Sequence, residues 1–244
     1  MEKILSRARI MTPLIILFSC LYLIPITGQI SEGSLVKGSK DPVYLIENGK
    51  ACWISGGNIF NLLGFDWKNV KTIPDEELKK IPRGWLIVRG YGSPIYILNY
   101  GIAIKVSDWN TLMNLGFEKT NIRQVQEEKL KRIPQQPLLV KGSGPAVYLI
   151  NNGKASWIQS EKIFKALGYD MNAVIDAKDA DLNKFPRTPM LVTGTDQKIF
   201  LVDKDKRYWI SSAELFNRLG YDWNAVITLS DQLIKKIPEG SPIK

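Results

Sequence analysis

The side chains best suited to bind a ligand are tryptophans and a lysine that recur at regular spacing. One set, spaced by 52 residues, comprises Trp53, Lys105, Trp157 and Trp209, and a second comprises Trp67 and Trp223. A position that accepts both tryptophan and lysine is expected to be partly exposed, because lysine seldom buries its charge. Partly exposed rings can stack on sugar faces or anchor a protein partner. The pattern predicts aromatic binding faces, and the alternative that these rings only cover packing between repeated units stays open.

Basic residues lie close to the first aromatic set, and they are Lys50, Lys154 and Arg207. The chain carries a formal net charge of +9, which favours anionic surroundings such as wall polymers, acidic glycans or membrane headgroups. The same side chains could simply be solvated hairpin ends. Nucleic acid is not expected as a partner, because the charge is spread along the chain without a long basic run.

No group of residues typical of catalysis or metal binding is found. The chain has no histidine and two cysteines, which removes the commonest general base and the thiolate zinc sites. Phosphate-binding glycine loops and GxSxG nucleophile turns are absent from the sequence. One acid recurs, as Asp66, Glu118, Asp170 and Asp222, and capping of the following turn is favoured over catalysis. We therefore expect no enzyme, no metal and no cofactor.

Four copies of one 52-residue unit account for the spacing. The glycine that ends the clearest helix recurs as Gly64, Gly116, Gly168 and Gly220. The copies span residues 33–84, 85–136, 137–188 and 189–240, and the last is followed by a tail to residue 244. We take 189–244 as the fourth copy with its tail.

Each copy predicts a short strand, a β-hairpin, a helix and a closing turn. In the first copy the strand lies at 35–36, and the hairpin at 43–54 turns at Asn48-Gly49, a pair that tolerates positive φ. A helix follows, which Ser55 is expected to cap. The corresponding caps in the other copies are Ser107, Gln159-Ser160 and Ser211. A weaker extended stretch at 70–73 and a helical turn at 75–81 complete the unit.

The first hairpin strand is apolar on both faces, as in Val43-Tyr-Leu-Ile46. A strand with water on one side would alternate, so this strand should be central, with the helix on one face and a neighbouring copy on the other. The fold class is therefore α+β, built from four tandem repeats that form either a closed pseudo-fourfold, propeller-like ring or an open array.

The segments Val147-Tyr-Leu-Ile-Asn-Asn-Gly-Lys154 and Leu219-Gly-Tyr-Asp-Trp-Asn-Ala-Val226, with the closing Ile-Pro pairs, resemble the tandem repeats of secreted and surface-attached bacterial proteins. The resemblance covers nearly all of residues 33–240. It implies repetition and a place outside the cell. It indicates no particular activity. The second copy departs most, with Lys105 and Lys119 at the two tryptophan positions.

The first 28 residues predict export. Lys3, Arg7 and Arg9 precede an apolar run at 11–26, which is typical of a secretory signal peptide or, if uncleaved, of an N-terminal anchor. Cys52 would then be the one cysteine left, so no internal disulfide is expected.

The sequence as a whole predicts a non-catalytic, secreted or cell-surface repeat protein. Its aromatic and basic faces would bind a cell-envelope glycan or an anionic wall polymer. The alternative is a structural scaffold that binds a surface protein and has no small ligand. A membrane would be contacted only through an uncleaved N-terminal segment.

Overall fold

The computed structural model describes residues 30–91, 94–118 and 122–244. The chain divides into residues 1–30 and 31–244, and the described secondary structure belongs to the second unit. The predicted signal peptide or anchor at 1–28 lies outside the described residues. Within the part that is described, no helix is long and apolar enough to cross a membrane.

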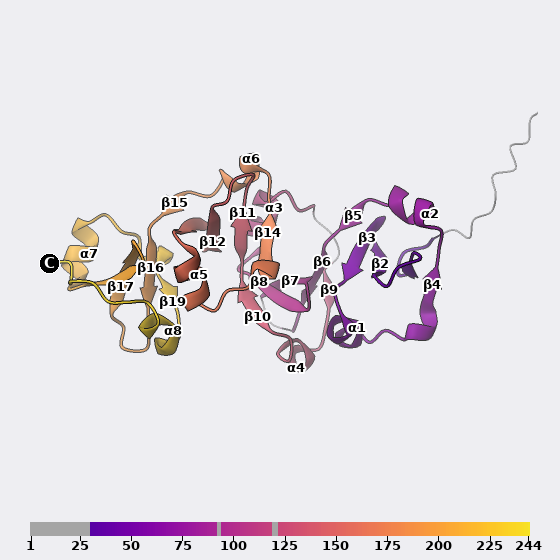
Figure 1. Ribbon diagram of the computed structural model, residues 1–244, viewed down its shortest axis with the longest axis horizontal. Coiled ribbons are helices and arrows are strands. Elements are labelled where there is room, and N and C mark those ends of the chain that lie inside the picture. The colour runs from indigo at the N-terminus through magenta and orange to yellow at the C-terminus, as the bar shows by residue number, and fades with distance from the viewer. Residues whose placement is uncertain (1–29, 92–93, 119–121) are drawn as a thin grey trace, which may run out of the picture. The chain divides into compact units, whose positions relative to one another are not determined.

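The protein is a mixed α+β tandem repeat in which each copy holds one small sheet and short helices (Figure 1). The first copy contains β1 (Leu35–Lys37), β2 (Val43–Glu47), β3 (Lys50–Ile54), α1 (Gly57–Leu62), the 3-10 turn η1 (Trp67–Asn69), β4 (Val70–Thr72), α2 (Asp75–Lys80) and β5 (Arg83–Gly84). The second contains β6 (Leu86–Arg89), β7 (Ile95–Asn99), β8 (Ile102–Val106), α3 (Trp109–Asn114), β9 (Arg123–Gln124), α4 (Glu127–Leu130) and β10 (Gln135–Pro137).

The third and fourth copies repeat this order. The third contains β11 (Leu139–Lys141), β12 (Val147–Asn151), β13 (Lys154–Ile158), α5 (Glu161–Ala166), η2 (Met171–Ala173), β14 (Val174–Asp176), α6 (Asp179–Leu182) and β15 (Arg187–Thr188). The fourth contains β16 (Met190–Thr193), β17 (Ile199–Asp203), β18 (Lys206–Ile210), α7 (Ala213–Arg218), η3 (Trp223–Ala225), β19 (Ile227–Thr228) and α8 (Asp231–Lys235).

The first hairpin strand of each copy is central in its sheet, as its two-sided hydrophobicity predicts. The first sheet has the order β4-β1-β2-β3-β5, and the second and third repeat it. The hairpin pairs are antiparallel, whereas both outer pairs, such as β1 with β4, are parallel. In the fourth sheet, Glu239 and Ile243 form bridges to the outer edge of β18.

The sequence interpretation missed the closing strands β5, β10 and β15. These strands have only two or three residues, so no alternation of polar and apolar side chains marks them. They form because the carbonyl oxygen of Pro82 accepts a hydrogen bond of 2.8 Å from the amide of Ala51, with equivalents in the later copies. A tertiary hydrogen bond therefore creates a strand that local preference does not.

All four hairpin turns place both central residues at positive φ. Asn48-Gly49 and Asn152-Gly153 do so as predicted, and the same geometry holds for Tyr100-Gly101 and for Lys204-Asp205. A two-residue turn of this kind matches the twist of the strands it joins. The register of each hairpin is therefore the same even where the preferred residues are absent.

The predicted helix caps are wrong by one residue in three copies. The caps lie at Gly56, Asp108, Ser160 and Ser212, so only the copy-three prediction at Ser160 is confirmed. Ser55 instead accepts a 3.0 Å hydrogen bond from the amide of Gly101 in the next copy. Its side chain joins two copies, a role that the sequence of one helix cannot indicate.

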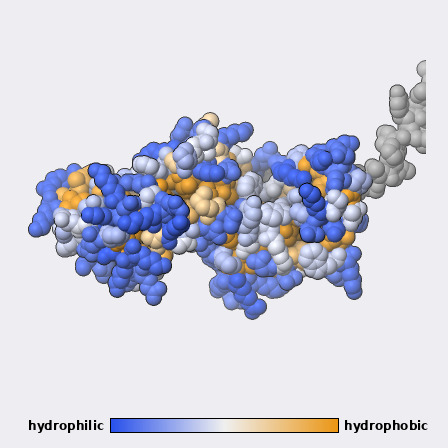
Figure 2. All heavy atoms as spheres, in the orientation of Figure 1, coloured by the Kyte–Doolittle hydropathy of each residue, from blue (hydrophilic) through white to orange (hydrophobic). Residues whose placement is uncertain are grey.

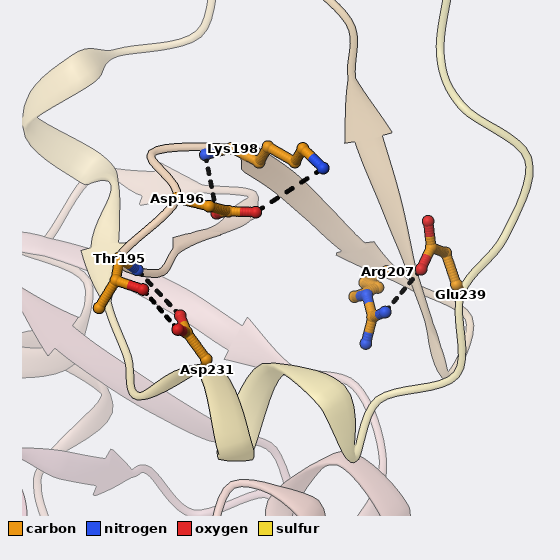
Figure 3. Close-up of polar contacts among 6 residues, drawn as sticks. All are labelled: Thr195, Asp196, Lys198, Arg207, Asp231 and Glu239. Atoms are coloured by element: carbon orange, nitrogen blue, oxygen red, sulfur yellow. Dashed lines mark hydrogen bonds and ion pairs between the residues drawn. The ribbon is translucent and has the colours of Figure 1, made fainter.

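A glycine follows the first strand of each copy, and a carboxylate from the closing helix explains it. These glycines are Gly38, Gly90, Gly142 and Gly194. Asp179 accepts hydrogen bonds from the amide of Ser143 (2.9 Å) and its hydroxyl (2.6 Å), and Asp231 holds Thr195 in the same way (Figure 3). A Cβ on Gly142 would collide with this carboxylate. The position stays glycine because the closing helix approaches the backbone too closely for a side chain.

Each sheet is covered on one face by the helix that follows its hairpin and on the other face by the closing helix of its copy. Three hydrophobic clusters each join the hairpin-helix face of one sheet to the closing-helix face of the next sheet. The first combines Ile59 and Phe60 of α1 with Leu130 of α4. The other two repeat this arrangement between the second and third sheets and between the third and fourth sheets. None of these clusters joins the fourth sheet to the first. The copies therefore form the open array, and the closed ring is not observed.

Candidate functional site: aromatic grooves of the repeats

The two predicted tryptophan sets meet in one groove of the first copy. We call this place in each copy the helix-side groove, which lies between the third strand, the first turn of the helix and the 3-10 turn. In the first copy it has a volume of about 260 Å³ and is lined by Trp53, Phe60 and Trp67. The ring of Trp67 stacks on Phe60 with centroids 4.1 Å apart and an interplanar angle of 14°. This stack covers the floor of the groove.

The fourth copy repeats the same stack. Trp223 lies over Phe216 at 4.1 Å and 35°, and its indole N–H donates a 2.8 Å hydrogen bond to Asn217. Trp209 is half-buried and packs against the cluster shared with the third copy. Trp209 therefore contributes to packing between copies, as the alternative interpretation allowed.

The helix-side groove of the third copy is open. Met171 replaces the tryptophan, and the volume rises to about 900 Å³. Trp157 is 49% exposed and Met171 57% exposed, whereas Phe164 is buried at the floor. The polar residues that line the groove are Gln159, Ser160, Glu161, Lys165 and Asp170. The result is an apolar floor between polar walls.

Most charges of this groove are paired within the fold. Lys165 lies 2.5 Å from Glu161 and lowers the pKa of that carboxyl below its usual value through a hydrogen bond. Asp170 accepts a 2.8 Å hydrogen bond from the amide of Asn172 and so caps η2. Burial raises the pKa of Tyr169, which keeps its hydroxyl protonated, and that hydroxyl has no partner among the described atoms. Such a groove can hold an uncharged ring bearing hydroxyl groups, and it presents no activated nucleophile.

The predicted basic residues make contacts inside the array. Lys50 pairs with Glu118 at 2.6 Å, and Lys154 pairs with Asp222, so each links one copy to the next. Arg207 donates to the carbonyls of Ile234 (2.6 Å) and Ile237 (2.8 Å) and to Glu239 (2.6 Å; Figure 3). Lys105 is exposed and lines a groove between the second, third and fourth copies.

The recurring acids have structural contacts in the described residues. Asp66, Asp170 and Asp222 each accept a hydrogen bond from the amide two residues on and cap the 3-10 turns, as predicted. Glu118 instead pairs with Lys50. Among the residues that the structure describes, no group of three or more His, Cys, Asp or Glu could hold a metal ion.

Phe164 and Tyr169 line the helix-side groove of the third copy, and neither was among the residues that the sequence indicated for a site. The available signal was the exchange of Trp67 and Trp223 for Met171, because in the first and fourth copies the tryptophan stacks on the phenylalanine at the floor. Figure 2 shows apolar surface as separate patches framed by hydrophilic residues on the face it displays.

Comparisons with known proteins give no family. No protein-family model and no curated protein matches the sequence. The solved structures that align with it include the periplasmic assembly from the ESX-5 inner membrane complex and an intact ESX-5 inner membrane complex. The first is 10% identical over 89% of this chain and 95% of that chain, with a TM-score of 0.20. The second is 11% identical over 90% and 81%, also with a TM-score of 0.20. Scores this low carry no argument about fold or function.

Proposed function

We propose that the chain is an exported, non-catalytic repeat protein that binds a cell-envelope glycan in the helix-side groove of its third copy. One observation carries the proposal: the third copy has Met171 in place of tryptophan, and its groove opens to about 900 Å³ beside the exposed ring of Trp157. The first and fourth copies cover the same floor with tryptophan. The first and fourth copies do not share the open groove, so the repeat does not require it.

The groove has the size and composition of a site for sugar units. Its volume of about 900 Å³ lies in the range of small-molecule sites, roughly 300–1,000 Å³. A sugar ring has an apolar C–H face, which suits the ring of Trp157, and equatorial hydroxyls, which suit the polar walls. The paired charges of Glu161 and Lys165 leave little net charge to select an anion.

The net charge of +9 adds a second, less specific contribution. It favours approach to anionic wall polymers at low ionic strength, and salt screens this attraction over about 10 Å at 0.1 M. Binding in the groove itself should persist at high salt, because apolar stacking is not screened.

The test is retention of the full chain on purified bacterial cell-wall material at low and at high salt. We expect Trp157→Ala to lose the retention that persists at high salt. The matched control is Trp223→Ala, which removes a ring of similar exposure (48%) from the covered groove of the fourth copy. This control should be retained like the wild type, and circular dichroism should show both variants folded.

Three outcomes would contradict the proposal. Equal loss in both variants would show that the third-copy groove is not the site. Retention abolished by salt alone would assign binding to net charge. No retention under any condition would favour the alternative, a scaffold that binds a surface protein.

A further inference from the structure

A different groove lies where the first copy meets the second and third, and we call it the junction groove. It has a volume of about 440 Å³, and the residues relevant here are Trp53, Arg83, Trp85, Tyr100 and Asp176. Trp85 is 40% exposed and Tyr100 is 55% exposed. The rings of Trp53 and Tyr100 meet edge to face, with centroids 4.8 Å apart and an angle of 85°. With Tyr44, four aromatic rings thus line one groove.

The array contains a counterpart of this groove 52 residues further on. The counterpart has a volume of about 570 Å³ and lies between the second, third and fourth copies. Lys105, Gln135, Pro137 and Asn152 stand where the junction groove has Trp53, Arg83, Trp85 and Tyr100. The repeat therefore builds the same frame without these side chains. Folding alone therefore does not require the aromatic rings of Trp53, Trp85 and Tyr100 in the junction groove.

The backbone conformation of Tyr100 is a second, independent indication that the junction groove has a function. It lies at φ 46° in the hairpin turn, where the first and third copies have asparagine. Positive φ is uncommon for a bulky aromatic residue, and backbone strain of this kind gathers at functional sites. The strained tyrosine places its ring against Trp53 beside the groove.

The groove also contains a guanidinium group that has no acidic partner. Arg83 lies over the ring of Tyr44, 4.4 Å from its centroid, and forms no ion pair within the described parts of the chain. The nearby carboxylate of Asp176 is paired with Lys141 at 3.2 Å. A guanidinium offers two parallel N–H donors that match a carboxylate.

From these observations we infer that the junction groove is a second binding site, and that it takes an acidic sugar whose carboxylate pairs with Arg83 while its ring stacks on the aromatic side chains. The site uses none of the residues of the third-copy groove, so either site can fail without the other.

The inference is tested by calorimetric titration of the full chain with a trisaccharide of galacturonic acid and with the neutral galactose trisaccharide. We expect the acidic trisaccharide to bind more tightly. Tyr100→Asn should weaken its binding at least tenfold, and the variant should fold because Asn152 occupies the equivalent turn. Arg83→Gln, which copies Gln135 of the counterpart, should remove the preference for the acidic trisaccharide and keep weak binding of the neutral one.

The control variant is Trp157→Ala, which should bind the acidic trisaccharide like the wild type. The inference is overturned if neither trisaccharide binds at millimolar concentration. It is also overturned if Tyr100→Asn binds as tightly as the wild type, or if Arg83→Gln keeps the full preference for the acid.

Discussion

Replacing Met171 by tryptophan would give the third copy the covered groove of the first and fourth. The new ring has a template in Trp67, which stacks on Phe60 at 4.1 Å and 14°. Phe164 occupies the position of Phe60, so Met171→Trp should form the same stack. An aromatic pair contributes about 0.5–1.5 kcal/mol beyond area burial. We expect the free energy of unfolding to rise by about that amount.

The same substitution should abolish binding in the groove. The open volume of about 900 Å³ should fall towards the 260 Å³ of the first copy. For a unit of this size, 1 kcal/mol corresponds to a rise in Tm of about 2–4 °C. Thermal unfolding followed by circular dichroism measures the first effect, and retention on cell-wall material at high salt measures the second.

The reverse exchange, Trp67→Met, is the matched control and should lower the free energy of unfolding by a similar amount. A Met171→Trp variant that is less stable than the wild type would refute the equivalence of the two grooves. A more stable variant that is retained as before would refute the assignment of binding to this groove.

Three further predictions concern strain, acid stability and thiol reactivity. Lys204→Asn should raise the free energy of unfolding by about 1 kcal/mol in urea titration, because Lys204 lies at φ 45° in its hairpin turn and asparagine tolerates positive φ better; an unchanged or lower value would contradict the strain. Hydrogen bonds from the hydroxyl and then the amide of Ser143 lower the pKa of Asp179, so this contact stabilises the fold above the unfolded pKa of about 3.9 and is lost as pH falls through the lower folded pKa. Asp179→Asn should therefore reduce the loss of stability between neutral and acid pH, and an unaltered pH profile would contradict this contribution. Burial raises the pKa of Cys52 to about 11, so iodoacetamide should label it at neutral pH only after unfolding, as mass spectrometry can show; rapid labelling of the folded chain would contradict its burial.

Elements defined by local patterns were predicted well from the sequence. The hairpins follow from apolar runs around Asn48-Gly49, and the central place of β2 follows from its two-sided hydrophobicity. The 3-10 turns follow from the acids that precede them, such as Asp170. Each of these features depends on residues a few positions apart, so the physical cause is present in the local sequence.

Features that depend on contacts between distant residues were not predictable. β5 forms because the amide of Ala51 donates a hydrogen bond to the carbonyl of Pro82. Ser55 accepts a hydrogen bond from the next copy instead of capping its own helix. The roles of Lys50 and Lys154 were also open, because their acidic partners lie 68 residues away. A charge pattern indicates that such a side chain is polar and gives no information about its partner.

The candidate sites also combine features that local sequence predicts with features that depend on contacts between distant residues. The sequence by itself determined that four equivalent units exist, that their tryptophan positions tolerate exchange, and that the second and third copies depart from the pattern. Only the tertiary structure decided that Trp53 and Trp67 share one groove, that Met171 opens its equivalent, and that Tyr100, Trp85 and Arg83 line one groove. Repetition is written in the spacing of residues along the chain, whereas a groove is formed by side chains that folding brings together from separate elements.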